Sequence, residues 1–219
     1  MKNKLTSFEQ AISKIKDGST IMIGGFLGVG APDQLIQALI DHNIKDITLI
    51  SNDTGFVDKS TGLLIANKLV KKVYATHIGT NKETGRQMFA GETEVVLVPQ
   101  GTLAEKIRAA GFGLGGVLTP TGVGTEVAVG KQIITIKERD YLLEEPLHAD
   151  VALLFANTVD TFGNMSFHGS TQNFNNVMAT AADYVVVEAE QVVSVGEMSQ
   201  DAVHVPGIFV DAIVQREDD

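Results

Sequence analysis

The chain has 219 residues, of which 44 % are hydrophobic and 20 % charged. This composition is typical of a folded protein, and we expect one α/β domain over residues 1–219. There is no cysteine, which excludes disulfides, thiolate catalysis and cysteine-ligated metal centres. The formal net charge of −10 argues against nucleic-acid binding. Neither a signal peptide nor an apolar run of ~18–20 residues is recognisable, so we expect a cytoplasmic protein without a membrane contact.

The first half of the chain alternates between helical and strand patterns. A capping box at Ser7–Gln10 opens an amphipathic helix that ends near Gly18. Thr20–Ile23 is an apolar run too short for a helix and is predicted to be a buried strand. Pro32 suits the first turn of the next helix, and Asp46–Ser51 follows as a strand.

The same alternation continues as far as residue 111. The predicted elements are a helix at Leu63–Val70, a strand at Val73–Thr76, a helix opened by a capping box at Thr80–Glu83, a strand at Glu94–Val98, and a helix that starts with a capping box at Thr102–Glu105. Strands that alternate with helices imply right-handed crossovers. We therefore predict an open, mostly parallel sheet with helices on both faces.

The pattern changes after this helix. Residues 111–125 (GFGLGGVLTPTGVGT) have neither helical nor strand period and are predicted to be a long functional loop. Ile133–Ile136 and Tyr141–Leu143 are predicted to pair as a hairpin. Two further buried strands are expected at Val151–Phe155 and Tyr184–Val187, with a helix within residues 171–182 between them.

The segment DGSTIMIGGFLGVGAP is the first candidate for ligand binding. Its strand opens into the glycine loop Gly24–Gly30, where glycines allow close approach of a ligand and the following helix N-terminus adds positive potential. It is not a Walker A loop, since Ala31-Pro32 stands where Lys and Ser/Thr are needed. A GxGxxG pattern does occur at residues 111–116, but it follows a helix and Pro120 prevents a new one, so a dinucleotide fold is not indicated.

Further polar candidates lie at other predicted strand ends. Gln100 lies between a strand and a helix, where its amide can donate to a carboxylate or carbonyl oxygen. Asn52 lies at the end of the predicted strand Asp46–Ser51. Glu188 and Glu190 end a buried strand and are interpreted as structural or interface groups. The histidines show no paired metal-ligand spacing, and no nucleophile elbow is present. Candidate binding loops are thus plentiful, while a catalytic residue is missing.

With these residues in view, the chain resembles the α subunits of family I coenzyme A transferases. The resemblance rests on the glycine segment above and on ISNDTGFVD, IGTNKETGRQM, VPQGTLAEKIRAAG, GLGGVLTPTGVGT and ADVALLFAN. It covers nearly the whole chain. It implies the three-layer α/β/α fold that these transferases share with ribose-5-phosphate isomerase-like proteins.

The resemblance also implies a mechanism and a partner. In this family a glutamate attacks an acyl-coenzyme A thioester, and ping-pong exchange proceeds through a glutamyl-coenzyme A thioester. That glutamate lies in a Glu-Asn-Gly segment of the β subunit, and no such tripeptide occurs here. The resemblance therefore implies one half of a heteromer, with α₂β₂ as the family's habit. Coenzyme A would be a substrate, and no resident cofactor or metal is implied.

The site residues implied by the resemblance fall into two groups. The coenzyme A-binding group is Gly24, Gly25, Phe26, Leu27, Gly28, Val29 and Gly30. The group expected in the acyl and carboxylate pocket is Asn52, Gln100, Gly115 and Gly116.

Three substrate or functional classes stay open from the sequence. The first is exchange among acetate, butyrate and acetoacetate. The second is a 3-oxoadipate or other 3-oxoacid transferase, although neither glycine loop carries an Arg or Lys to hold a second carboxylate. The third is a non-catalytic module that binds a coenzyme A ester or a sugar phosphate.

Overall fold

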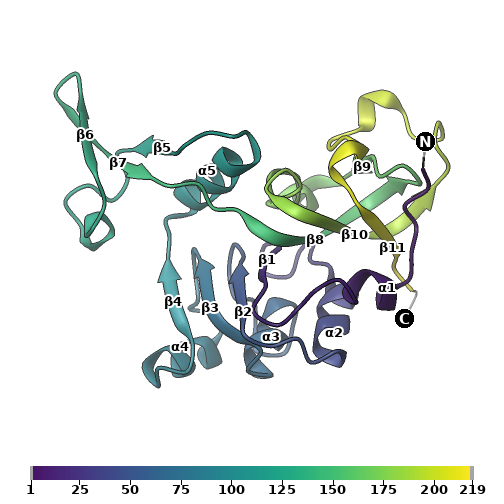
Figure 1. The fold of residues 1–219 in the computed structure, drawn as a ribbon, viewed down its shortest axis with the longest axis horizontal. Coiled ribbons are helices and arrows are strands. Elements are labelled where there is room, and N and C mark those ends of the chain that lie inside the picture. Colours follow the sequence, from purple (N-terminus) through teal and green to yellow (C-terminus); the bar gives the residue numbers. More distant parts are fainter. Residues whose placement is uncertain (1, 218–219) are drawn as a thin grey trace.

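The computed structural model describes residues 2–217 and is built around one large sheet. Seven strands follow one another across it in the order β11-β10-β8-β1-β2-β3-β4, and every neighbouring pair is parallel. The short strand β9 pairs antiparallel with β8. The predicted mostly parallel sheet is therefore confirmed (Figure 1).

The strands of this sheet vary greatly in length. They are β1 (Thr20–Ile23), β2 (Ile47–Ile50), β3 (Val70–Ala75), β4 (Glu94–Leu97), β8 (Ala149–Asp160), β9 (Met165–Ser166), β10 (Ala182–Val193) and β11 (Ala212–Gln215). The short central strands are buried on both faces, which is why they appear in the sequence as continuous apolar runs.

Helices cover both faces and bury two separate cores. The helices are α1 (Phe8–Ile12), α2 (Asp33–Asp41), α3 (Thr61–Ala66), α4 (Lys82–Phe89), α5 (Gln100–Gly111) and α6 (Asn175–Met178). Alternate residues of β1 divide between the cores: Ile21 and Ile23 pack with α1, α2 and α3, whereas Met22 packs with α5 and α6. Because successive side chains of a strand point to opposite faces, β1 contributes to both cores and joins the three layers.

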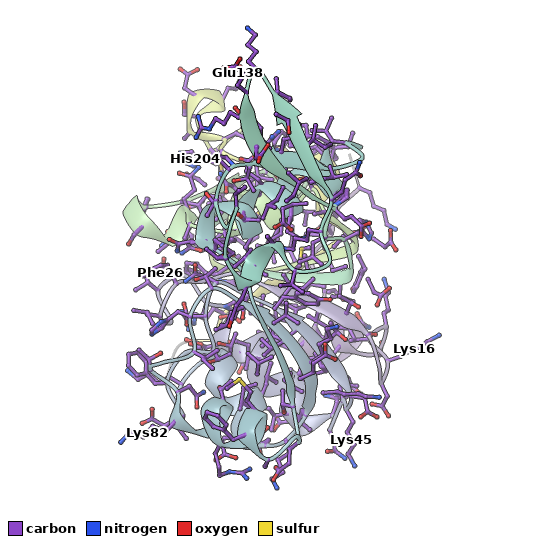
Figure 2. The ribbon with its side chains drawn as sticks, turned by 90° about the vertical axis from the view of Figure 1, so that its left-hand side faces the viewer. Lys16, Phe26, Lys45, Lys82, Glu138 and His204 are labelled. Atoms are coloured by element: carbon purple, nitrogen blue, oxygen red, sulfur yellow. The ribbon has the colours of Figure 1, made fainter. Side chains whose placement is uncertain are left out.

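A small antiparallel sheet, here called the arm, projects from the main body beside α5 (Figure 1). It consists of β5 (Val117–Thr119), β6 (Ile133–Ile136) and β7 (Arg139–Glu144), in the order β5-β7-β6. The predicted hairpin is confirmed. Its turn residues Lys137 and Glu138 both have positive φ, as a two-residue hairpin turn of type I′ requires, and Glu138 lies at the tip (Figure 2).

A buried carboxylate fixes the arm to α5. Glu144, at the end of β7, is 1 % exposed and pairs with Lys106 of α5 at 3.0 Å and with Lys131 before β6. Burial opposes ionisation of Glu144, but the hydrogen bonds from Lys131 and Lys106 outweigh it and hold the pKa of this carboxyl below its ordinary value. The arm and α5 are therefore joined by paired buried charges.

Several predicted elements needed correction. Residues 111–125 are not wholly irregular, since they contain β5. The helix expected within residues 171–182 is reduced to the four-residue α6, and a 3₁₀ turn, Gly169–Gln172, precedes it. The helix predicted at Leu63–Val70 is shorter, because Val70 already belongs to β3. The helix α5 starts at Gln100 instead of at the Thr102–Glu105 box.

Glu188 of β10 caps helix α2. Its side chain is fully buried, and its Oε2 accepts the backbone N–H groups of Gln34 and Leu35, each at 2.9 Å. The Nε of Arg216 lies 3.3 Å from Oε1, although this oxygen accepts no hydrogen bond. The structural role predicted for Glu188 is thereby given a definite form, a carboxylate at a helix N-terminus.

Glu188 should make stability depend on pH in an unusual direction. Burial raises its pKa to about 7, against the ordinary 4.5. Because the folded state then holds a proton that the unfolded state releases, this residue stabilises the fold at pH below about 4.5 and loses that contribution as pH rises through 7. Glu188→Gln keeps an acceptor for Gln34 and Leu35 and removes the titration.

Urea unfolding of the wild type and Glu188→Gln between pH 4.5 and 8 tests this prediction. The difference in unfolding free energy between the two proteins should shift in favour of the variant as pH rises. Glu190→Gln, the same substitution at an exposed position of β10, serves as the matched control. A wild-type-minus-Glu188→Gln difference that is flat over this range would contradict the assignment.

Candidate functional site

The candidate site lies at the carboxyl edge of the main sheet. The chain runs from β1 to β2 on one side, while β8 pairs with β1 on the other, so the strand order reverses at β1. Ligands of open α/β sheets bind at such a switch point, beyond the strand ends. The loops that follow β1 and β2 carry the glycines and Asn52, and Gln100 is the first residue of the helix that follows β4. The parallel strands bring all three to one edge.

The glycine loop forms a tight hairpin at its tip. Phe26 and Val29 exchange backbone hydrogen bonds of 3.0 and 2.9 Å. Between them Leu27 and Gly28 have φ of 49° and 84°, the pattern of a type I′ turn. The turn projects the side chains of Phe26 and Val29, which are 42 % and 46 % exposed, and Figure 2 shows Phe26 at the surface.

Two asparagines from the segment around α6 hold this loop from one side. Asn173 accepts the N–H of Gly25 at 3.1 Å and donates to Val29 O at 3.0 Å. Asn175, fully buried, donates to Gly30 O at 2.9 Å, and its Oδ1 accepts the N–H of Phe155 in β8. These side chains replace the strand or helix partners that a loop backbone lacks.

Most N–H groups of the glycine loop are therefore already in use. Within the described residues, those of Gly24, Gly25, Phe26, Leu27 and Val29 donate to other groups of the chain. The loop thus differs from a phosphate-cradling nest, whose N–H groups converge on the ligand. What it presents outward is the exposed Phe26–Val29 hairpin, and its contact with coenzyme A stays a prediction.

The N-terminus of α2 is also occupied. The N–H groups of Gln34 and Leu35 lie in its first turn and have no partner within the helix. Both donate to Glu188, as described above. The expectation that this helix end supplies positive potential to a ligand is therefore wrong, because a buried carboxylate of the same chain takes that place.

Asn52 and Gln100 are brought into direct contact. Gln100 Nε2 donates to Asn52 Oδ1 at 2.6 Å, and Asn52 Nδ2 donates to Asp53 Oδ2 at 2.8 Å. Asn52 is 2 % exposed, whereas Gln100 is exposed. Two amides predicted from separate strand ends thus form one hydrogen-bonded pair, with Gln100 on the solvent side.

Gln100 borders a surface hollow of about 440 Å³. Its lining comes from the glycine loop, α5 and the segment around α6, namely Phe26, Gln100, Ala104, Glu105, Arg108, Asn173, Phe174, Asn176 and Val177. The Arg108 guanidinium is paired with Glu105 at 2.6 Å. The hollow therefore combines an apolar wall, an amide and a neutralised cation.

Gly115 and Gly116 do not line this hollow. They precede β5, and a Cβ on Gly116 would lie 2.9 Å from both the Glu144 carbonyl oxygen and a methyl carbon of Leu143. Close packing within the arm accounts for glycine at 116. A part for these two residues in a substrate pocket stays a prediction.

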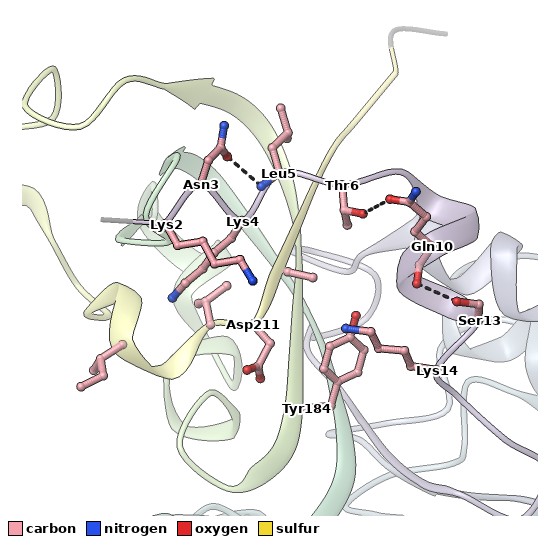
Figure 3. A pocket seen from close by; sticks show the side chains of 13 residues that line it. Lys2, Asn3, Lys4, Leu5, Thr6, Gln10, Ser13, Lys14, Tyr184 and Asp211 are labelled. Atoms are coloured by element: carbon pink, nitrogen blue, oxygen red, sulfur yellow. Dashed lines mark hydrogen bonds between the residues drawn. The ribbon is translucent and has the colours of Figure 1, made fainter.

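A larger hollow, of about 660 Å³, lies elsewhere (Figure 3). It is lined by the first residues of the chain, α1, Tyr184 and Asp211. Two of its lysines have partners, since Lys14 lies over the Tyr184 ring at 4.6 Å and Lys4 donates to Gly207 O at 2.7 Å. It has none of the predicted site residues.

Other candidate groups are ordinary surface or structural residues. Glu190 accepts from Asn157 Nδ2 at 2.7 Å. Among residues 2–217 no three His, Asp or Glu side chains gather in a way that could hold a metal ion. Over the same residues no helix is both long and apolar enough to cross a membrane.

Comparison with known proteins decides the family. The model of the coenzyme A transferase family matches residues 5–216. The chain belongs to the coenzyme A transferase family. It is 52 % identical to the acetate CoA-transferase subunit alpha of Escherichia coli K12, covering 98 % of this chain and 97 % of that one. It is 50 % identical to the acetoacetyl-CoA:acetate/butyrate CoA transferase alpha subunit of Clostridium acetobutylicum, over 99 % of each.

Solved structures of transferases share the fold. An acyl-CoA transferase of E. coli O157:H7, in a thioester complex with CoA, superposes with a TM-score of 0.88 at 22 % identity, covering 98 % of this chain. The chain spans 47 % of that longer protein. Glutaconate coenzyme A-transferase of Acidaminococcus fermentans gives a TM-score of 0.86 at 21 % identity, over 97 % of this chain and 75 % of the other.

The sequence did not point to the residues that hold the loop. Asn173 and Asn175 lie in the segment predicted as a helix, where asparagines count as weak helix formers and not as partners of a loop some 145 residues away. The available signal was the run NFNN at residues 173–176, whose three asparagines are unfavourable within a helix.

Gly24→Ala tests how tightly the loop is held. A Cβ on Gly24 would lie 1.8 Å from Asn175 Oδ1, so the asparagine has to leave its position and the hydrogen bonds to Gly30 and Phe155 are lost. We expect a loss of about 1–3 kcal/mol in unfolding free energy. Urea denaturation measures it.

Gly85→Ala is the matched control for this substitution. Gly85 lies in α4, and no atom lies within 4 Å of its built Cβ. This variant should be as stable as the wild type or up to about 1 kcal/mol more stable. Equal stability of the two alanine variants would contradict the role given to Asn175.

Proposed function

We propose that this chain is the alpha subunit of a heteromeric coenzyme A transferase that exchanges coenzyme A between short-chain acyl-coenzyme A and a carboxylic acid. This proposal is supported by the family match together with full-length relatives at 50–52 % identity that are named as alpha subunits. The chain itself has no Glu-Asn-Gly segment for the family's nucleophile. The reaction therefore requires a partner subunit that supplies the glutamate.

The proposed chemistry divides between the two subunits. The partner's glutamate carboxylate attacks the thioester carbonyl, and the thiolate leaves from the tetrahedral intermediate as an acyl-glutamyl anhydride forms. The thiolate then attacks the glutamyl carbonyl, which releases the carboxylate product and leaves a glutamyl-coenzyme A thioester. The incoming acid reverses these steps. Each step develops negative charge on a carbonyl oxygen, which a fixed N–H donor stabilises.

Gln100 is the residue of this chain that we assign to that donor role. One hydrogen of its Nε2 is held by Asn52, so the amide is oriented while its second hydrogen is free of any partner within residues 2–217. The exposed position beside the hollow allows a partner subunit to bring its glutamate and the substrate to it. Phe26 supplies an apolar wall of the same hollow.

The hollow supports monocarboxylate substrates over 3-oxo-diacids. A second carboxylate on the substrate would need a cationic partner when desolvated. Arg108 is the cationic residue of the lining, and Glu105 already pairs with it. Relatives at 46 % and 42 % identity carry succinyl-CoA:3-ketoacid transferase names, so the test compares acetate, butyrate and acetoacetate with succinate as acids.

The first experiment searches the neighbouring genes for a product of similar size that carries Glu-Asn-Gly, and purifies the chain alone and together with that product. The complex should exchange coenzyme A between acetyl-coenzyme A and butyrate or acetoacetate, and the chain alone should not. Exchange by the chain alone would overturn the division of the site. A non-catalytic binding module would bind the ester but show no exchange in either preparation.

The second experiment removes the Gln100 amide in the complex. Gln100→Ala should lower kcat about 10²-fold, the usual loss for one donor to a developing oxyanion. Gln37→Ala, an exposed glutamine of α2 that donates to Asp41 at 2.8 Å, is the control and should leave kcat unchanged. Unchanged rate and affinity in Gln100→Ala would remove Gln100 from the site.

A further inference from the structure

Asp53 is a buried carboxylate that the proposed reaction does not use directly. It is 5 % exposed, and no Lys, Arg or His of the described residues forms an ion pair with it. Three hydrogen-bond donors bind its carboxylate oxygens instead. Leu27 N–H and Asn52 Nδ2 donate to Oδ2 at 2.9 and 2.8 Å, and Gly55 N–H donates to Oδ1 at 2.8 Å.

The carboxylate determines how the neighbouring amides are turned. An ionised carboxylate only accepts hydrogen bonds, so Asn52 has to direct its NH₂ group towards Asp53. The Asn52 side-chain oxygen is thereby directed at Gln100, and Gln100 can donate to it only through its own NH₂ group. A chain of two hydrogen bonds thus fixes which end of the Gln100 amide faces Asn52.

The same oxygen of Asp53 also reaches the glycine loop. Leu27 has φ of 49°, a left-handed conformation that is unfavourable for a side chain with a Cβ. The hydrogen bond from its N–H to Asp53 Oδ2 helps hold the turn in this conformation. Asp53 therefore joins the loop that carries Phe26 to the amide pair.

We propose that Asp53 is a positioning residue for coenzyme A transfer: acting through Asn52, it orients the Gln100 amide as a donor and ties the glycine loop to that amide pair. This inference rests on the proposed function, in which Gln100 donates to the reacting carbonyl oxygen. A carboxylate suits this role because it accepts hydrogen bonds from both Asn52 and Leu27, so its position determines how both amides are turned.

A double-mutant cycle in the complex of both subunits tests the proposal. Asp53→Ala should lower kcat about 10- to 100-fold, since a misplaced donor loses most of its effect. In a Gln100→Ala background the same substitution should lower kcat by a several-fold smaller factor, because the amide that Asp53 positions is gone and only its contact with the glycine loop is left to lose. A purely structural effect of Asp53 would cause an equal fold-loss in both backgrounds.

Asp53→Asn is a second variant that tests the same role if Asp53→Ala does not fold. It is isosteric and keeps one acceptor oxygen, but its NH₂ group also lets Asn52 turn around, so we expect a smaller fall in kcat that is again reduced with Gln100→Ala. Asp41→Ala is the control. Asp41 is likewise a carboxylate that accepts from a side-chain amide, but it lies on the exposed surface of α2, and its loss should leave kcat unchanged.

The outcomes separate this inference from the proposed function. If Gln100→Ala lowers kcat and the Asp53 losses are equal in both backgrounds, the positioning role is overturned and the proposed function stands. If Gln100→Ala has no effect, the donor role of Gln100 and the Asp53 inference are both overturned. If the complex transfers no coenzyme A with any acid, the proposed function itself is overturned.

Discussion

Asn175 donates to Gly30 O in the glycine loop while its Oδ1 accepts from Phe155 N in the long strand β8. The architecture of the carboxyl edge depends on this kind of bond. Loops at this edge have no ladder or helix to satisfy their backbone, and burial without partners would cost about 1–3 kcal/mol for each group. Carboxamides and one carboxylate supply those partners, so the backbone of an irregular segment is satisfied without a ladder or a helix.

Individual elements show how much of the secondary structure could be predicted from the sequence. Thr20–Ile23 was predicted with the bounds that β1 has, because a fully buried parallel strand is a continuous apolar run between turn residues. β8 and β10 were predicted as short cores of what are twelve-residue strands. Their outer halves contain Asn157, Asp160 and Gln191, whose pairing depends on neighbours far along the chain and leaves little local signal.

The candidate site shows the same limit. Asn52 and Gln100 were predicted separately, each as a polar residue after a strand, and the parallel sheet brings them into contact. The anchoring of Gly24–Gly30 could not be predicted, because it depends on asparagines from the far end of the chain. The occupied N-terminus of α2 was missed for a similar reason, since Glu188 lies more than 150 positions from the N–H groups it accepts.

The ion pairs of Glu144 give the arm a mechanical relation to the site. α5 begins with Gln100, and Lys106, which holds Glu144, lies six residues later, about 9 Å along the same helix. A helix of this length behaves as a stiff rod. The hairpin is connected through β7 and Glu144 to the middle of α5, and Gln100 is the first residue of that helix. The arm and the Gln100 amide are thus held by one and the same helix, six residues apart.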